Sequence, residues 1–145
     1  MRTALVTTRI DVAALLAEVA DVATGATTLF VGTVREVNEG RAVTAIEYSA
    51  YEAMAARELA AIATEAATRF GTPHVVVVHR LGRLALGEAS VAIAVAHARR
   101  GPALDAQRYV IEELKRRVPI WKLEHYVDGE RHWVGQGSAA EGAAR

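Results

Sequence analysis

Apolar residues repeat with helical spacing in three stretches of the chain. Asp11 precedes the first stretch and can cap a helix by accepting a backbone N–H. Ser49 and Glu52 have the spacing of a capping box at the start of the second stretch, and Gly71 predicts its end. Pro119 predicts the end of the third stretch. The pattern therefore predicts helices over residues 12–19, 50–70 and 101–118.

Strand-like segments, in which apolar positions alternate or run without interruption, separate these helices. The turn sequence Asn38-Glu39-Gly40 lies between two such segments and predicts a hairpin. Asp128-Gly129 predicts a second hairpin. The apolar run that begins at His74 is typical of a strand buried on both faces. Strands are predicted over residues 27–37, 43–48, 74–81, 91–97, 122–127 and 131–134.

The order of these elements predicts a single α+β domain with two-layer packing and an additional antiparallel hairpin. The chain has 145 residues, which is enough for one domain with a buried core. Its glycines form neither a G-x-G-x-x-G sequence nor a P-loop, so no common nucleotide-binding fold is indicated. We expect the domain to cover residues 1–134 and a flexible, small and polar tail to follow over 135–145.

The overall composition excludes several classes of protein. Apolar residues make up 52% of the chain and charged residues 23%, which is typical of a globular domain. Seventeen basic side chains balance seventeen acidic ones, so no net field attracts nucleic acid or an anionic membrane. The absence of cysteine excludes disulfides, thiolate metal sites and a cysteine nucleophile. Because no apolar run resembles a signal peptide or could span a bilayer, we expect a soluble, cytoplasmic protein.

Positive charge is concentrated late in the chain. Residues 97–122 contain seven basic and three acidic side chains. Lys115 and Lys122 are the only lysines; an arginine-rich composition explains this bias, but a lysine amine can also lose a proton where a guanidinium cannot. Arg99 and Arg100 directly precede a predicted helix, which indicates either an anion site or an exposed charged turn.

Lys115 borders the apolar stripe of the third predicted helix, one turn after Ile111 and beside Leu114. Partial burial and neighbouring cations should lower its pKa, which suits general acid–base or nucleophilic chemistry. For Arg116 and Arg117, in the same last turn, the helix dipole is a sufficient explanation.

Other common sites find little support in the sequence. Five histidines match no compact metal-ligand spacing, so we expect no metal, and His79 is interpreted as a hydrogen-bonded core residue. No G-x-S-x-G turn indicates a hydrolase. The aromatic residues are not interleaved with the basic ones, as they would be on an RNA-binding surface.

Four segments resemble, in order and spacing, the large catalytic subunit of molybdopterin synthase. The resemblance covers about residues 26–134, and its most specific part is a Lys-x-x-x-Pro-x-Trp-Lys block. The segments are Phe30-Val-Gly-Thr-Val-Arg35, Glu47-Tyr-Ser-Ala-Tyr-Glu-Ala-Met54, His79-Arg-Leu-Gly82 and Glu113-Leu-Lys-Arg-Arg-Val-Pro-Ile-Trp-Lys-Leu-Glu124.

The resemblance implies an α/β-hammerhead fold and a homodimer with a small ubiquitin-like sulfur-carrier subunit at each end, a heterotetramer in all. The carrier's C-terminal Gly-Gly tail, activated as a thiocarboxylate, would enter a pocket of this chain. Sulfur would pass to cyclic pyranopterin monophosphate, and two transfers would build the dithiolene that later holds molybdenum. The resemblance implies no metal or organic cofactor bound to this sulfurtransferase.

By position, the resemblance gives Lys115 the role of catalytic lysine and Lys122 that of a second pocket lysine. In the family, a His-Arg pair from the neighbouring protomer binds the substrate phosphate, and the corresponding positions here hold Arg99 and Arg100. Arg99 can donate to a phosphate but cannot shuttle a proton. The implied substrate-binding residues are Thr33, Val34, Arg35, Arg99, Arg100, Leu123 and Glu124.

A non-enzymatic module of the same fold is the alternative hypothesis. Such a module would bind a phosphorylated pterin or a ubiquitin-like tail and would leave the precursor unchanged.

Overall fold

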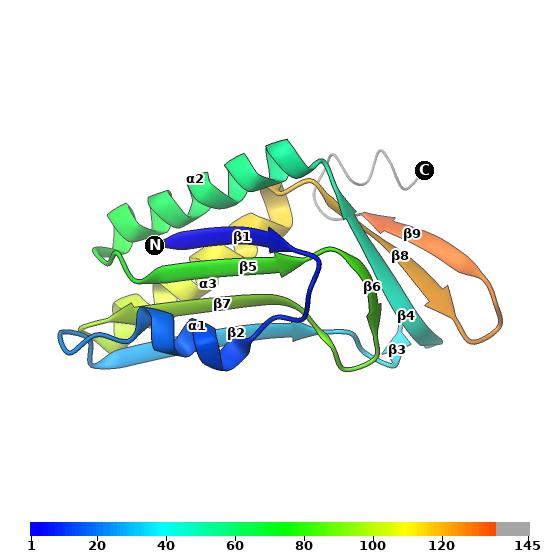
Figure 1. Cartoon of the computed structure of the whole chain (residues 1–145), viewed down its shortest axis with the longest axis horizontal. Coiled ribbons are helices and arrows are strands. Elements are labelled where there is room, and N and C mark those ends of the chain that lie inside the picture. Colours follow the sequence, from blue (N-terminus) through cyan, green and yellow to red (C-terminus); the bar gives the residue numbers. More distant parts are fainter. Residues whose placement is uncertain (136–145) are drawn as a thin grey trace.

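The computed structural model describes residues 1–135, which form three helices and nine strands. Figure 1 shows them as an elongated molecule with a helix-covered sheet at one end and a second sheet at the other. The elements are β1 (Arg2–Val6), α1 (Val12–Val19), β2 (Ala26–Thr33), β3 (Val37–Asn38), β4 (Arg41–Ala50), α2 (Glu52–Phe70), β5 (Val75–Arg80), β6 (Gly82–Ala85), β7 (Ala89–His97), α3 (Arg100–Arg117), β8 (Ile120–Tyr126) and β9 (Arg131–Gly135).

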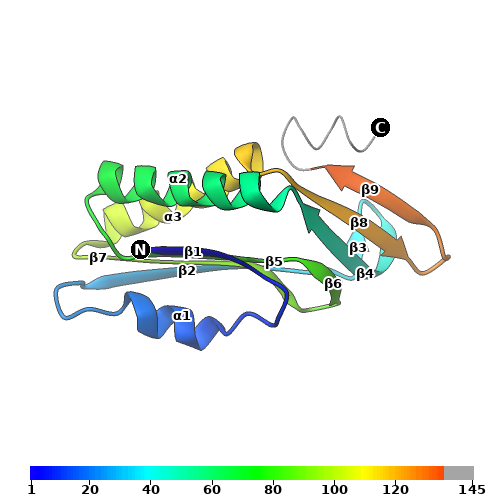
Figure 2. The same cartoon turned by 45° about the horizontal axis from the view of Figure 1, so that its top comes forward.

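The first sheet has the strand order β1-β5-β7-β2 and is covered on both faces. Helices α2 and α3 lie on one face and α1 on the other, as Figure 2 shows. In β7 the larger side chains, such as Ile93, belong to the core under α2 and α3, whereas alanines such as Ala94 belong to the core under α1. Because both faces are buried, β5 and β7 are apolar along most of their length, which the sequence predicted for β5.

The second sheet is built around β4, which pairs antiparallel with β8 over most of its length. β9 extends this sheet beyond β8, and the short strands β3 and β6 both pair with β4. The β8–β9 hairpin is the one predicted from Asp128-Gly129, and Gly129 has a φ of 89°. The prediction of a single α+β domain with an additional hairpin is confirmed, and α1 adds a third layer over part of the first sheet.

The predicted hairpin over residues 27–48 is wrong in its pairing. β2 pairs with β7 in the first sheet, and only the two residues of β3 pair back onto β4. The chain leaves the first sheet at Val34, whose side chain is buried in the main core and whose N–H donates to the Glu88 carbonyl at 3.1 Å. This crossing from one sheet to the other brings residues 35–38 beside the end of α3.

Three local predictions also need correction. The capping box at Ser49 is absent, because Ser49 remains in β4 and pairs with Trp121. Helix α2 therefore begins only at Glu52, and Tyr51, which precedes it, supplies no side-chain cap. Residues 2–6 form β1 and residues 82–85 form β6, and neither strand was among those predicted. By contrast, Asp11 caps α1 as predicted, because its carboxylate accepts from the Ala14 N–H at 3.0 Å.

The predicted flexible tail begins at Gly135, which is the last residue of β9. Residues 136–145 lie outside the described part of the chain.

Candidate active site

A pocket of about 260 Å³ lies where the two sheets meet the C-terminal end of α3. Its wall combines cationic, polar and apolar side chains from elements that are far apart in the sequence. The lining residues are Phe30, Gly32, Thr33, Arg35, Asn38, Val43, Ile46, Tyr48, His79, Ser90, Val91, Leu114, Lys115, Lys122 and Glu124.

The two lysines of the chain meet in this pocket. Lys115 comes from the last turn of α3, and Lys122 from β8, which begins directly after Pro119 ends the helix. Lys115 is an exposed residue, yet the groups around its amine in the pocket partly desolvate it. This desolvation, assisted by the positive charge of Lys122, lowers the pKa of Lys115. The lowered pKa predicted from the sequence is therefore confirmed.

A buried carboxylate organises the wall beside Lys122. Glu124 is only 1% exposed, and its two oxygens accept from the Asn38 amide at 2.8 and 3.0 Å. The Tyr126 hydroxyl donates to the same carboxylate at 2.8 Å, and the Lys122 amine lies 3.7 Å from it. Because burying a carboxylate without hydrogen-bond partners is costly, these contacts hold Asn38 and Lys122 in place around Glu124.

Arg35 and Thr33 reach the pocket on the segment that crosses between the sheets. An Nη2 of Arg35 donates to the Asn38 side-chain oxygen at 3.3 Å, which connects the guanidinium to the Glu124 network. The β2–β7 register shifts between Gly32 and Thr33. Gly32 also allows the two strands to approach closely, because a Cβ there would lie 2.8 Å from a methyl group of Val91.

His79 and Tyr48 form part of the pocket wall that sequence reasoning did not assign to a site. His79 is 2% exposed and its Nδ1–H donates to the Arg80 carbonyl at 3.0 Å, so its interpretation as a hydrogen-bonded core residue is confirmed. Burial lowers the pKa of His79 to about 4. The Tyr48 ring packs edge-on against the imidazole, and burial raises the pKa of the Tyr48 hydroxyl. In the sequence, Tyr48 and His79 could have been identified from the Glu47–Met54 and His79–Gly82 segments, which carry part of the family resemblance.

Not every residue expected at the site reaches the pocket. Val34 is buried in the main core, and Leu123 is buried on β8 but does not line the pocket. Arg99 and Arg100 line a different, open depression at the N-terminal end of α3. Lys115 follows Arg100 by fifteen residue positions in the same helix, which is about 22 Å along the axis. Within one chain, the arginine pair and the lysine pair are therefore apart.

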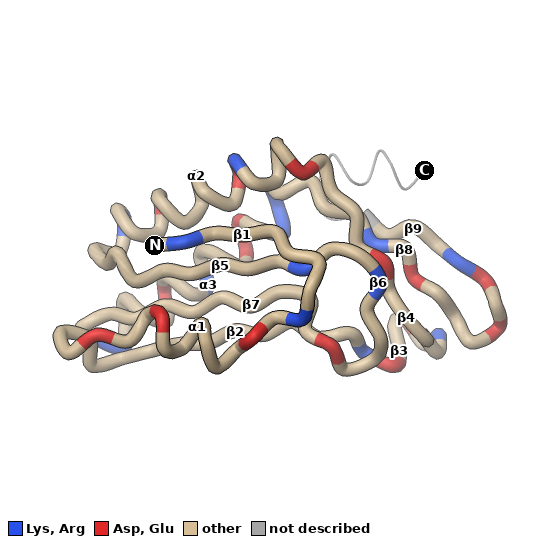
Figure 3. Tube along the Cα trace, viewed as in Figure 1, with Lys and Arg blue, Asp and Glu red and all other residues tan. Residues whose placement is uncertain are grey.

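The positive segment 97–122 is also less uniform than its composition suggested. Arg108 and Arg116 pair with carboxylates on their own helix, and Arg117 pairs with carboxylates of α2. Figure 3 shows positive and negative residues interspersed along the trace, with no large region of one sign. The local cationic site consists of Lys115, Lys122 and Arg35, a smaller group than the whole segment.

Two further findings concern residues 1–135. The structure brings no three potential metal-ligating side chains together in that range. None of the three helices combines the length and apolar character needed to cross a bilayer.

Comparison with known proteins gives a consistent result. The sequence model of the MoaE protein family matches residues 5–117. A molybdopterin synthase catalytic subunit from Oryza sativa subsp. indica is 48% identical over 122 residues, and one from Halalkalibacterium halodurans is 44% identical over 111 residues. These alignments cover 84% and 77% of this chain, and 63% and 70% of the respective relatives. The chain thus spans somewhat less than two thirds of the rice protein.

A solved structure shows the same fold. The molybdopterin synthase structure from Staphylococcus aureus superposes with a TM-score of 0.85 at 34% identity, over 91% of this chain and 96% of that one. The matched family region contains β2, β7 and α3 in full, with Lys115 on the last turn of α3. By sequence and by fold, the chain belongs to the MoaE protein family.

Proposed function

We propose that this chain is the catalytic subunit of a molybdopterin synthase, a sulfurtransferase that acts in molybdenum cofactor biosynthesis. Its substrate is cyclic pyranopterin monophosphate, and the sulfur comes from the C-terminal thiocarboxylate of a small ubiquitin-like carrier subunit. The relatives named as molybdopterin synthase catalytic subunits support this assignment. The observation that carries it is the convergence of Lys115 and Lys122, the only two lysines, in one pocket.

The charges in the pocket suit the proposed reactants. A cyclic phosphate and a thiocarboxylate are both anions, and Lys115, Lys122 and Arg35 supply the opposite charge in a partly enclosed space. Electrostatic attraction is stronger there than on an open surface, because less water screens it. Arg35 also offers a planar set of N–H donors, which suits phosphate or carboxylate oxygens.

Lys115 has the environment that proton transfer or nucleophilic attack requires. Its lowered pKa leaves a larger fraction of the amine unprotonated near neutral pH. An unprotonated amine can take a proton or attack an acyl carbon, and an ammonium cannot. We therefore assign the catalytic role to Lys115 and a charge-stabilising role to Lys122.

The geometry favours an indirect role for Glu124. Its carboxylate is already engaged by Asn38, Tyr126 and Lys122, and it is almost fully buried. We assign to it the positioning of Lys122 and Asn38, where the sequence resemblance implied a contact with substrate.

We further propose that Arg99 and Arg100 act on the pocket of a second copy of the chain in a cytoplasmic homodimer. Within one chain they lie about 22 Å along α3 from Lys115, so they can contribute to a phosphate site only through another protomer. With a carrier subunit at each pocket, the assembly is a heterotetramer. Val34 and Leu123 are both buried, and their neighbours in the chain line the pocket.

The test is to mix the purified chain with cyclic pyranopterin monophosphate and the thiocarboxylated carrier, and to follow both by mass spectrometry. The proposal predicts loss of the precursor, formation of the dithiolene product and conversion of the carrier tail to a carboxylate. Binding of either reactant without loss of precursor would support the non-enzymatic module instead.

A further inference from the structure

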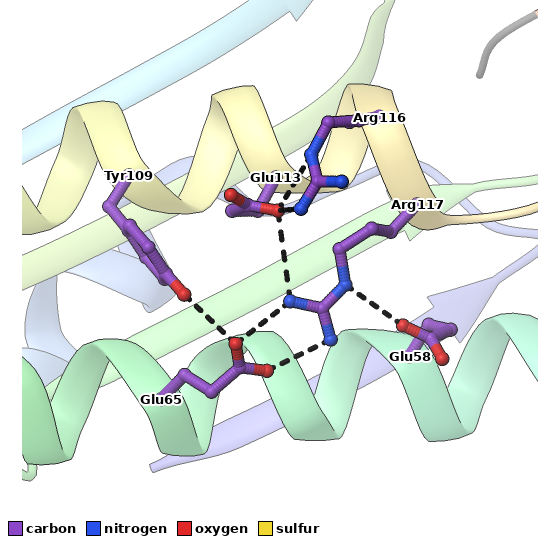
Figure 4. A network of polar contacts seen from close by, with 6 residues as sticks. All are labelled: Glu58, Glu65, Tyr109, Glu113, Arg116 and Arg117. Atoms are coloured by element: carbon purple, nitrogen blue, oxygen red, sulfur yellow. Dashed lines mark hydrogen bonds and ion pairs between the residues drawn. The ribbon is translucent and has the colours of Figure 1, made fainter. Parts of the chain in front are cut away.

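A network of polar and charged side chains lies between α2 and the second half of α3. Figure 4 shows Arg117 between the two helices, directed toward two carboxylates of α2. The side chains that cross between the helices are those of Glu58 and Glu65 on α2 and of Tyr109 and Arg117 on α3, whereas Glu113 and Arg116 form an ion pair within α3.

Arg117 makes the contacts that cross between the helices. Its two terminal nitrogens donate to the two oxygens of Glu65 at 2.8 and 2.9 Å, and its Nε donates to Glu58 at 3.1 Å. The Tyr109 hydroxyl donates to Glu65 at 2.9 Å. Hydrogen bonds from Arg117 and Tyr109 lower the pKa of Glu65, so the carboxylate is charged at neutral pH. A two-pronged guanidinium–carboxylate contact fixes orientation as well as distance.

Apart from an edge-on contact between Phe70 of α2 and Tyr109 of α3, eight residues before Arg117, the buried side chains of the two helices are mostly small. Five of the nine buried residues on α2 and α3 are alanines. Small side chains allow two helices to approach but provide low ridges, which resist sliding less than interlocked large side chains do. The directional contact that Arg117 makes near the end of α3 therefore contributes to fixing this end of the helix relative to α2.

Arg117 and Lys115 stand on opposite sides of the same helical turn. Two residues correspond to about 200° of rotation, so one side chain can face α2 while the other faces the pocket. Any rotation or shift of this turn moves the Lys115 amine relative to Lys122, which is held on β8 beside Glu124. A displacement of about 1 Å can reduce a catalytic rate about 100-fold.

We propose that Arg117 is a positioning residue for Lys115, because its fork to Glu58 and Glu65 holds the last turn of α3 in the orientation that directs the amine into the pocket. This inference rests on the proposed function only for its kinetic test.

Arg116 provides a matched control. It precedes Arg117, carries the same charge and bonds to a carboxylate, Glu113, at 3.1 Å. Glu113 lies on the same helix, and the Arg116 side chain is 69% exposed. Replacing Arg116 with lysine therefore makes the same chemical change one residue away but breaks no contact with α2.

The experiment compares Arg117→Lys and Arg116→Lys, which keep the charge and remove the fork. We expect Arg117→Lys to lower kcat at least about tenfold, with KM for the carrier changed less than twofold, and Arg116→Lys to leave both values within twofold. Glu58→Gln, which weakens one of the three bonds, should lower kcat by a smaller factor and serves if Arg117→Lys does not fold. Melting temperatures identify variants that are folded under assay conditions.

A second readout does not depend on activity. Because the chain contains only two lysines, ¹³C-lysine labelling of the wild type gives two ε-carbon signals, which a Lys122→Arg variant assigns. Arg117→Lys and Arg116→Lys each add a third signal from the introduced lysine, and combining each with Lys115→Arg identifies the signal of Lys115. A pH titration should show the pKa of Lys115 moving toward the ordinary lysine value in Arg117→Lys, while Arg116→Lys matches the wild type.

The outcomes separate this inference from the proposed function. If the wild type forms product while folded Arg117→Lys keeps kcat within twofold, or loses no more than Arg116→Lys, the positioning role is wrong and the sulfurtransferase assignment stands. If the wild type forms no product, the assignment fails and the titration decides: an unchanged Lys115 pKa in Arg117→Lys overturns the positioning role, and a shifted one supports it.

Discussion

The two ends of α3 carry similar positive charge in different surroundings. At the C-terminal end, Lys115 lies in a pocket with Lys122, and Arg117 is bound by carboxylates of α2. At the N-terminal end, Arg99 and Arg100 are exposed beside an open depression and pair with no carboxylate among residues 1–135. Enclosure, and not the number of cations, is what distinguishes the two ends of α3, and under the proposed function the enclosed end carries out the chemistry and the open end binds.

The enclosed end should show the largest loss on mutation. Lys115→Ala removes the amine with the lowered pKa, and we expect it to reduce kcat by about 10²–10⁴-fold, the usual contribution of a proton-transfer group. Single-turnover product formation measures the loss, and an unchanged circular dichroism spectrum checks the fold. Turnover within a few-fold of the wild type would remove Lys115 from the mechanism.

Burial at the enclosed end also predicts a pH effect on stability. The pKa of His79 is about 4 when folded and near 6.5 when exposed, so the unfolded chain binds a proton first as pH falls. The associated stability is complete above pH 6.5 and decreases toward pH 4. Between pH 6.5 and 4.5 we expect a loss of about 2 kcal/mol in the free energy of unfolding, measured by urea titration.

A His79→Gln variant is the control for this effect. It removes the titrating group, so its free energy of unfolding should depend less on pH over the same interval. Equal slopes for variant and wild type would show that the imidazole is not desolvated in the folded protein.

At the exposed end, substitutions should affect binding more than chemistry. Arg99→Ala and Arg100→Ala each remove a charge-assisted donor, so we expect KM for the phosphate substrate to rise about tenfold. Because exposed charges are screened, the difference from wild type should shrink as salt increases. A kcat loss as large as that of Lys115→Ala, with KM unchanged, would contradict the division of roles.

The smallest effect is expected midway along the helix. Arg108 and Glu112 form an exposed pair at 2.9 Å, with side chains 79% and 62% exposed. Arg108→Ala should change the free energy of unfolding by at most about 0.5 kcal/mol and leave the kinetics unchanged. A larger kinetic effect would show that charge along the whole of α3 affects the reaction, which would contradict the expected difference between its two ends.

The sequence predicted most of the elements because their local signals were strong. The Asp11 cap, the left-handed Gly71 at the end of α2 and the Asp128-Gly129 turn were all read correctly. The pairing of β2 was predicted incorrectly. The turn sequence Asn38-Glu39-Gly40 is the same whether the strands on either side of it pair over two residues or over ten, so it does not fix the length of the hairpin. Ser49 failed as a cap because pairing with Trp121 keeps it in β4.

For the site, composition and resemblance identified the lysines but not their surroundings. The lowered pKa of Lys115 could be expected from its place beside an apolar stripe. The roles of Asn38 and Tyr48 could not, since they depend on the crossing between two sheets. Positive charge over 97–122 suggested a single patch, and only the folded chain shows that Arg117 faces α2.

The most direct test of the account is a titration of the two ¹³C-labelled lysine signals with a peptide that ends in the carrier's Gly-Gly carboxylate. If one pocket holds both amines and receives the acidic tail, the Lys115 and Lys122 signals should shift together with the same dissociation constant, and Lys115→Ala should weaken binding to Lys122. Independent shifts with different constants, or no shift of either signal at saturating peptide, would contradict the central claim.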